Sequence, residues 1–184
     1  RLNYEIERLH VNNNVLDNCF STLKHETMYY PSRIRQLIDD PEKNIIVLNE
    51  ITTYYKELYS ILSMQGLNQV ETNVKIDDNL VHYLLTLIRK LSGEKVLSLK
   101  NNDSSKDYIQ YKIEMPNLKL TREQTHNLFT PSTHDLSCLV IRQIVREIGE
   151  TTNQRGCGVL AMHRDDGGID VILTLSKKIK INTQ

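Results

Sequence analysis

The fold is decided by residues 2–39, LNYEIERLHVNNNVLDNCFSTLKHETMYYPSRIRQLID, which carry mostly apolar residues at alternating steps of four and three. This heptad series consists of Leu2, Ile6, Leu9, Asn13, Leu16, Phe20, Leu23, Thr27, Tyr30, Ile34 and Leu37. An apolar seam of this period is typical of a long helix that packs in a bundle or coiled coil. Asn13 and Thr27 are polar breaks in the seam, and a polar seam residue fixes register although it lowers stability.

His25 is the residue of this helix that we single out for chemistry. It lies two residues past Leu23, on the side away from the seam, so we expect its imidazole to face solvent. Glu26 follows it directly, and Pro31 comes five residues after Glu26. A proline inside a helix removes one backbone donor and crowds the preceding turn, so we expect a bend just past the histidine.

A second long helix follows a turn at residues 39–42. Pro41 suits the first helical position, and the helix is predicted over about 42–71. Its seam consists of Leu48, Ile51, Tyr55, Leu58 and Leu62, followed by Gln65 and Gln69. Two long helices joined by a short turn predict an antiparallel hairpin. One hairpin cannot bury both seams alone, so we expect a homodimer that closes a four-helix bundle.

The second half of the chain has a different pattern, and we place the domain boundary between 1–72 and 73–184. The predicted strands are 74–76, 96–99, 108–115, 159–162 and 169–175. Three helices are predicted. Residues 79–91 are capped by Asp77 and Asp78, 121–129 begin with Thr121 as the cap, and 136–150 have Gly149 at the end. The whole chain is therefore predicted to be α+β, with a helical hairpin followed by a sheet that carries helices on one face.

Composition excludes several classes of protein. The 184 residues contain 23 Lys and Arg and 23 Asp and Glu, so nothing favours nucleic acid or an anionic membrane as a partner. The three cysteines, Cys19, Cys138 and Cys157, are odd in number and far apart, which favours a reducing compartment. No spacing of Cys and His indicates a metal site, and no apolar run is long enough to span a membrane. Because the chain opens at Arg1 inside a heptad, we expect it to be a fragment of a longer protein.

A two-helix dimerising hairpin followed by such a lobe resembles the core of sensor histidine kinases, over nearly the whole chain. Lys24-His25-Glu26-Thr27, with Pro31 downstream, resembles the phosphoacceptor box of that family. The proline normally lies five residues after the histidine, whereas here it lies six residues after it. The chain, and residues 24–37 above all, is also similar to an uncharacterised group of predicted signalling proteins from Bacteroides-type bacteria.

The resemblance implies a function and a set of partners. His25 would be the phosphoacceptor, and Glu26 would orient its ring or accept its proton. The second half would be a Bergerat-like lobe of the GHKL ATPase type, a fold that in this family binds ATP and magnesium. The partner would be the receiver domain of a response regulator, and the fragment would be cytoplasmic. Phe129-Thr130-Pro131 resembles the Phe-x-Pro segment of the family.

The nucleotide-binding positions of the family are altered in this chain. Lys90 occupies the position of an asparagine that holds magnesium, and a lysine carries donors only. Met115 stands where an aspartate accepts a hydrogen bond from adenine, and Asn117 and Lys119 replace two glycines. Residues 133–138 contain no glycine where the family has a glycine-rich lid. We therefore predict a degenerate lobe without ordinary ATP binding, and no cofactor or metal.

Three functions remain open at this point. The first is a pseudo-histidine kinase, or phosphotransfer module, that acts through His25 on a response regulator. The second is a non-enzymatic dimerisation and docking platform, in which His25 is only a surface residue. The third is an active histidine kinase with an atypical ATP site. Residues 155–158, Arg-Gly-Cys-Gly, could form an anion-binding loop, although a glycine turn explains them better.

Overall fold

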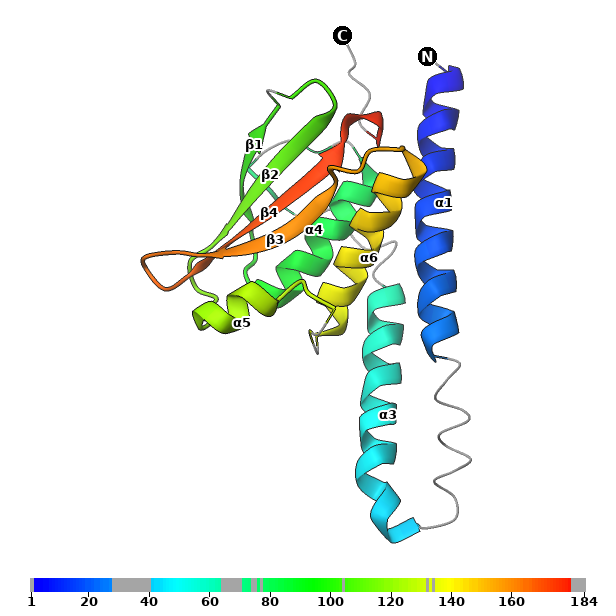
Figure 1. Ribbon diagram of the computed structural model, residues 1–184, viewed down its shortest axis with the longest axis vertical. Helices are drawn as coiled ribbons and strands as arrows, with labels where there is room; N and C mark the ends of the chain where they lie inside the picture. Colours follow the sequence, from blue (N-terminus) through cyan, green and yellow to red (C-terminus); the bar gives the residue numbers. More distant parts are fainter. Residues whose placement is uncertain are drawn as a thin grey trace.

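The computed structural model describes residues 2–27, 41–63, 71–73, 76, 78–103, 105–131, 133 and 135–179 (Figure 1). Its helices are α1 (Leu2–Thr27), α3 (Pro41–Ser63), α4 (Asn79–Ser92), α5 (Arg122–Asn127), α6 (Leu136–Thr151) and the 3₁₀ helix η1 (Lys177–Ile179). Its strands are β1 (Ser98–Asn102), β2 (Tyr108–Met115), β3 (Gly158–His163) and β4 (Ile169–Ser176). The α+β expectation for the second half is therefore confirmed.

The four strands form one antiparallel sheet in the order β1-β2-β4-β3. Its centre is the pair β2 and β4, in which Tyr111 lies opposite Leu173 and Ile113 lies opposite Val171. Alternate residues of β2 are buried, as a strand with one covered face requires. Helices α4 and α6 lie together on that face, and Figure 1 shows them between the strands and α1. The core of the lobe is the layer between these helices and the sheet.

The other face of the sheet carries ion pairs between neighbouring strands. Lys112 lies 2.8 Å from Asp170, and Arg164 lies 3.0 Å from the second oxygen of the same carboxylate. Lys100 on β1 pairs with Glu114 on β2. Opposite charges facing each other across strands favour the observed register, and they leave this face compatible with water.

Helix α4 forms where the sequence predicts it, because its cap is local. The Asp78 carboxylate accepts hydrogen bonds from the backbone N–H groups of Leu80 at 2.8 Å and Val81 at 3.0 Å. Gly93 ends the helix in the left-handed region, at φ 67°. Helix α5 has a capping box, in which the side chains of Thr121 and Gln124 each accept a backbone N–H.

The helix predicted over 136–150 is confirmed to within one residue, but Gly149 lies inside it and is not its cap. Helix α6 continues to Thr151, and Thr152 is its C-cap. The glycine serves a different purpose, because a Cβ at this position would lie 2.9 Å from the Gln154 carbonyl oxygen and 3.3 Å from the Cys157 Cβ. Its missing side chain lets the loop after α6 fold back against the helix.

Strand β1 also differs from its expected bounds of 96–99. It begins at Ser98 and runs through Asn102, which the sequence placed in a polar turn. Leu97 instead forms an isolated parallel bridge with Thr72. Asn101 pairs with Tyr111 in β2. Backbone pairing to a buried strand here outweighs the low strand propensity of asparagine.

Helix α1 packs against the lobe through a face beside the predicted seam. It contacts α6 and η1, and it buries Asn12, Val15 and Cys19 at 6 %, 0 % and 0 % exposure. The seam residues Ile6 and Leu9 are 56 % and 49 % exposed. Among the seam residues of α1 whose side chains the structure describes, Leu16 packs against the core, whereas Ile6 and Leu9 are exposed.

Helix α3 begins at Pro41, as predicted, and it also contacts α6. It buries Ile51 and Ile61, and the Ile61 carbonyl accepts a 3.1 Å hydrogen bond from the Tyr83 hydroxyl of α4. Residues 28–40, which include the expected bend at Pro31, lie outside the described residues. So do 64–70 and 74–75, where the end of the second helix and a short strand were expected.

Candidate functional site

The two residues predicted to carry chemistry lie near the end of α1. His25 and Glu26 are in its last turn, which closes at Thr27. Their side chains, like Pro31, lie outside the described part of the structure. The backbone therefore has the helical conformation that the prediction needs, and the solvent exposure of the imidazole stays a prediction.

The positions that the resemblance assigns to nucleotide binding lie around the end of β2. Met115 is the last residue of this strand, it pairs with Ile169, and its side chain is 0 % exposed. Its thioether is only a weak acceptor, so this buried position offers no carboxylate to an adenine amino group. Lys90 is exposed near the end of α4. An ammonium group there repels a divalent cation instead of binding it.

The segment after Met115 is covered by the hairpin between β3 and β4. A Cβ on Gly168 would lie 2.7 Å from Pro116 Cα and 2.9 Å from the Met115 carbonyl oxygen, so the two backbones are in close contact. The Lys119 ammonium donates a 2.8 Å hydrogen bond to the Asp166 carbonyl. The Asn117 amide donates to Glu94 at 3.2 Å. Side chains thus bridge the segment to its neighbours at both positions where the family has glycine.

The N-terminus of α6 is capped by its own carboxylate. Asp135 Oδ1 accepts a 2.9 Å hydrogen bond from the Cys138 backbone N–H, and the Asp135 carbonyl accepts one from Leu139. A carboxylate here stabilises the helix dipole, but it repels a phosphate that would bind the same donors. Burial raises the pKa of the Cys138 thiol, and the neighbouring Asp135 raises it further. The helix end is therefore occupied by an anion of the chain itself.

Three positions that the resemblance assigns to magnesium and ATP carry side chains of a different chemistry. Lys90 carries only donors, Met115 is a weak acceptor, and Asp135 places a carboxylate at the N-terminus of α6. Among the described residues, no three side chains of His, Cys, Asp or Glu come together as ligands for a metal ion. No described helix combines the length and apolar character that a membrane span requires.

The structure reveals a buried polar contact that the sequence did not indicate. Asn12 on α1 lies in hydrogen-bond range of Asp78, the cap of α4, at 3.4 Å. The His82 Nε2, also on α4, lies 2.7 Å from the Ile76 carbonyl. Asn12 stands in a run of three asparagines, and nothing in the sequence separates it from Asn13 and Asn14.

The sequence matches no protein-family model and no curated protein sequence. Solved structures with a similar arrangement include the catalytic domain of the histidine kinase ThkA, at 15 % identity and a TM-score of 0.42, covering 71 % of this chain and 93 % of that one. ThkA in complex with the response regulator TrrA gives 14 % identity and a TM-score of 0.44, over 97 % of this chain and 68 % of that one. The histidine kinase AdeS of Acinetobacter baumannii gives 12 % identity and a TM-score of 0.41, over 92 % of this chain and 94 % of that one.

Proposed function

We propose that this chain is a histidine-kinase-like signalling module that exchanges phosphate through His25 without binding ATP at the lobe. The donor or acceptor is an aspartate on the receiver domain of a response regulator. The proposal joins the sequence resemblance around His25 with the lobe geometry described above. It makes the module a phosphorelay component and not a source of phosphate.

The chemistry requires a neutral imidazole beside a carboxylate. An imidazole nitrogen attacks the phosphorus of an aspartyl phosphate, the new P–N bond forms, and the acyl P–O bond breaks to release the aspartate carboxylate. The proton on the other ring nitrogen is held by Glu26 or passes to water. In the reverse direction the receiver aspartate attacks the phosphohistidine, and the imidazole leaves with a proton. Neither direction needs a nucleotide.

The main support for the proposed loss of ATP binding is the set of contacts around Met115. The methionine is fully buried, and the Gly168 backbone lies against its carbonyl. Lys119 crosses the segment to bind the carbonyl of Asp166. A nucleotide base would meet a buried methionine thioether at this position instead of a carboxylate, and it would have to displace contacts within the protein.

Support for a homodimer comes from the apolar residues that the chain leaves uncovered. Ile6 and Leu9 on the seam of α1 are 56 % and 49 % exposed, and Ile45 on α3 is 61 % exposed. Apolar side chains that recur along a helix at heptad spacing are typical of a face that packs against another helix. A second copy of the chain would cover this face in a four-helix bundle.

The test is phosphate transfer from a phosphorylated receiver domain. The purified chain is incubated with receiver domains carrying labelled aspartyl phosphate, and acid-labile label on the chain is measured. We expect label on the wild-type chain and none on the His25→Ala variant. The matched control is His10→Ala, which removes an exposed histidine from the same helix. Absence of transfer in either direction, or label that survives in His25→Ala, contradicts the proposal.

A second function is favoured by the packing of α1 on the lobe. The Asn12–Asp78 contact connects the helix that carries His25 to the first helix of the lobe. A non-enzymatic docking platform would change how a partner binds through the position of α1 alone, with no phosphate involved. In the parent protein, signalling that persists after His25→Ala favours the platform, whereas signalling that is lost favours the relay.

A further inference from the structure

We propose that the groove between α6 and the edge strand β3 binds a small anionic molecule, one that carries a phosphate or carboxylate group on an apolar, ring-sized body. Neither His25 nor Met115 is among the residues that line this groove. It encloses about 600 Å³, which lies within the range of about 300–1,000 Å³ that is usual for small-molecule sites. The proposal does not depend on the function proposed for His25.

The position of the groove separates it from the corner that resembles a nucleotide site. Its walls are α6 from Arg142 onward, the loop that follows, the start of β3, and Phe129 from the segment after α5. Asp135 caps the opposite end of α6. At a rise of about 1.5 Å per residue, the cap and the glycine at position 149 are roughly 20 Å apart along the helix.

The charges that line the groove are mostly positive. Arg142, Arg146 and Arg155 line it, against the single carboxylate of Glu150. Arg146 is engaged by Glu150, whose carboxylate lies 2.9 Å from its Nε. Within the part of the chain that the structure describes, no carboxylate forms an ion pair with Arg142 or Arg155. Two guanidinium groups are thus available to an anion, and their planar forks match carboxylate and phosphate oxygens.

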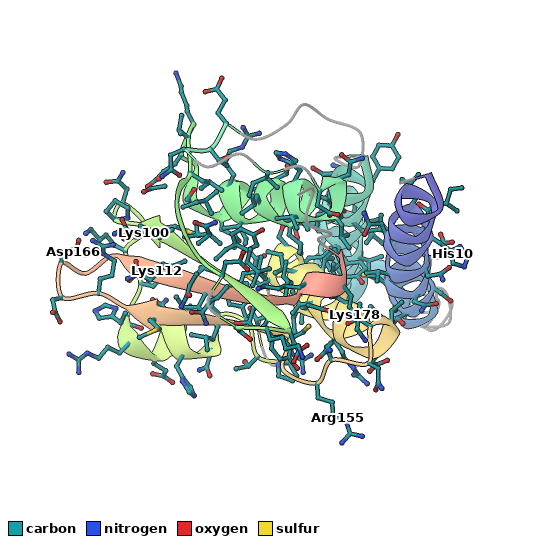
Figure 2. All side chains as sticks on the ribbon, turned by 90° about the horizontal axis from the view of Figure 1, so that it is seen from above. His10, Lys100, Lys112, Arg155, Asp166 and Lys178 are labelled. Carbon is teal, nitrogen blue, oxygen red and sulfur yellow. The ribbon has the colours of Figure 1, made fainter. Side chains whose placement is uncertain are left out.

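The two available arginines have different settings. Arg142 is half-buried on the wall of α6, where water solvates its charge only in part. Arg155 is exposed, and Figure 2 shows it extending from the loop after α6 at the rim of the molecule. We infer that Arg142 is the main contact to the ligand anion and that Arg155 closes over it from the rim.

The floor of the groove is apolar. Phe129 is 7 % exposed and Val145 is 1 % exposed, and the half-buried Val159 and Cys157 continue the same surface. This surface suits a ring or short aliphatic body, which would be removed from water on binding. An anionic group joined to such a body therefore fits better than a free inorganic anion.

The loop that carries Arg155 is held in place by its own contacts. The Gln154 N–H donates a 2.8 Å hydrogen bond to the Gly149 carbonyl, and the Gly156 N–H donates a 3.0 Å bond to the Tyr108 hydroxyl. The Lys178 ammonium donates to the Thr152 carbonyl at 2.9 Å. The Arg-Gly-Cys-Gly segment forms a turn, as expected, but that turn is also one wall of an arginine-lined groove. A preformed wall lowers the ordering cost of binding.

The test is a titration of the isotope-labelled full chain with phenyl phosphate, followed by NMR signals of arginine Nε–H and backbone amides. We expect saturable shifts at Arg142 and at the amides of Cys157 and Val159. Inorganic phosphate should give weaker saturation, and phenol should give none. The proposal is overturned if no shifts appear up to about 10 mM phenyl phosphate, a concentration at which even weak binding would be seen.

Three variants make the test specific. Arg142→Gln should weaken phenyl phosphate binding roughly tenfold, as expected for loss of one charge-assisted hydrogen bond. Glu150→Gln should strengthen binding, because among the described residues that line the groove it removes the only carboxylate. Lys100→Gln removes one positive charge from β1, the opposite edge of the sheet, and should leave the affinity unchanged. An equal loss of affinity in Lys100→Gln and Arg142→Gln would show general charge attraction and would also overturn the proposal.

Discussion

Asn12 Nδ2 lies 3.4 Å from Asp78 Oδ2, so a side chain from the N-terminal helix contacts the residue that caps the first helix of the lobe. Both residues are buried, at 6 % and 2 % exposure. The other oxygen of Asp78 accepts the backbone N–H groups of Leu80 and Val81. One carboxylate therefore caps α4 and also contacts α1.

The first prediction concerns this contact. Asn12→Ala should lower the free energy of unfolding by about 1–2 kcal/mol, because it leaves one oxygen of a buried carboxylate without this donor. The exposed neighbour Asn13 serves as the control. Asn13→Ala should change the free energy of unfolding by less than about 0.5 kcal/mol. Urea unfolding of both variants measures the difference. Equal effects in the two variants would show that the contact contributes nothing.

The second prediction concerns alkaline pH. Because burial and Asp135 raise the pKa of the Cys138 thiol, the folded protein keeps a proton that the unfolded chain loses above about pH 8.5. This thiol therefore stabilises the fold fully below that pH, and the contribution is lost as the pH rises toward the folded pKa. Compared with Cys138→Ala, the wild-type protein should lose about 1 kcal/mol more between about pH 7.5 and pH 9.5.

Urea unfolding at both pH values in reducing buffer measures this loss. Burial also raises the pKa of Cys157, but this residue is present in both proteins, so the difference isolates Cys138. Parallel pH profiles for wild type and Cys138→Ala would mean that the thiol ionises as easily in the fold as in the unfolded chain.

The third prediction concerns the hairpin that covers the end of β2. Gly168→Ala should destabilise the lobe by about 2 kcal/mol, because the new methyl group would overlap Pro116 and the Met115 carbonyl. Gly158→Ala is the matched control, since a Cβ there meets nothing within 4 Å. Thermal unfolding of the two variants separates them. A stable Gly168→Ala protein would show that the hairpin does not lie against this segment.

The fourth prediction concerns self-association. Leu9→Lys should shift the mass in solution from dimer to monomer, because it places a charge on the seam where an apolar contact is proposed. His10→Lys changes the adjacent exposed residue outside the seam and should leave the mass unchanged. Light scattering after size exclusion measures both. A wild-type chain that is monomeric at every concentration tested would contradict the dimer.

Sequence patterns predicted those helices and strands of the lobe whose bounds are decided by local interactions. The alternation in residues 108–115 gave the bounds of β2, and the capping residues Asp78 and Thr121 placed the starts of α4 and α5. These features depend on residues within a few positions of one another, so they can be recognised before the fold is known.

Other features depend on distant contacts and were missed. The face of α1 that buries Val15 and Cys19 lies beside a seam of similar apolar character, and only the position of α6 selects between them. The role of Gly149 depends on the return of Gln154 and Cys157 toward the helix. For the candidate site, the sequence placed His25 and Glu26 on a helix. The contacts around Met115 could not be predicted, because they come from residues more than 50 positions away.

We propose that the lobe keeps a kinase-like arrangement and does not bind ATP. Calorimetric titration of the purified chain with ATP and magnesium measures this binding. We expect no saturable heat up to about 1 mM ATP, because Lys90, Met115 and Asp135 stand where the resemblance implies a magnesium ligand, an adenine acceptor and a glycine-rich lid. Binding of one ATP per chain with a dissociation constant of about 0.1 mM or tighter would contradict it.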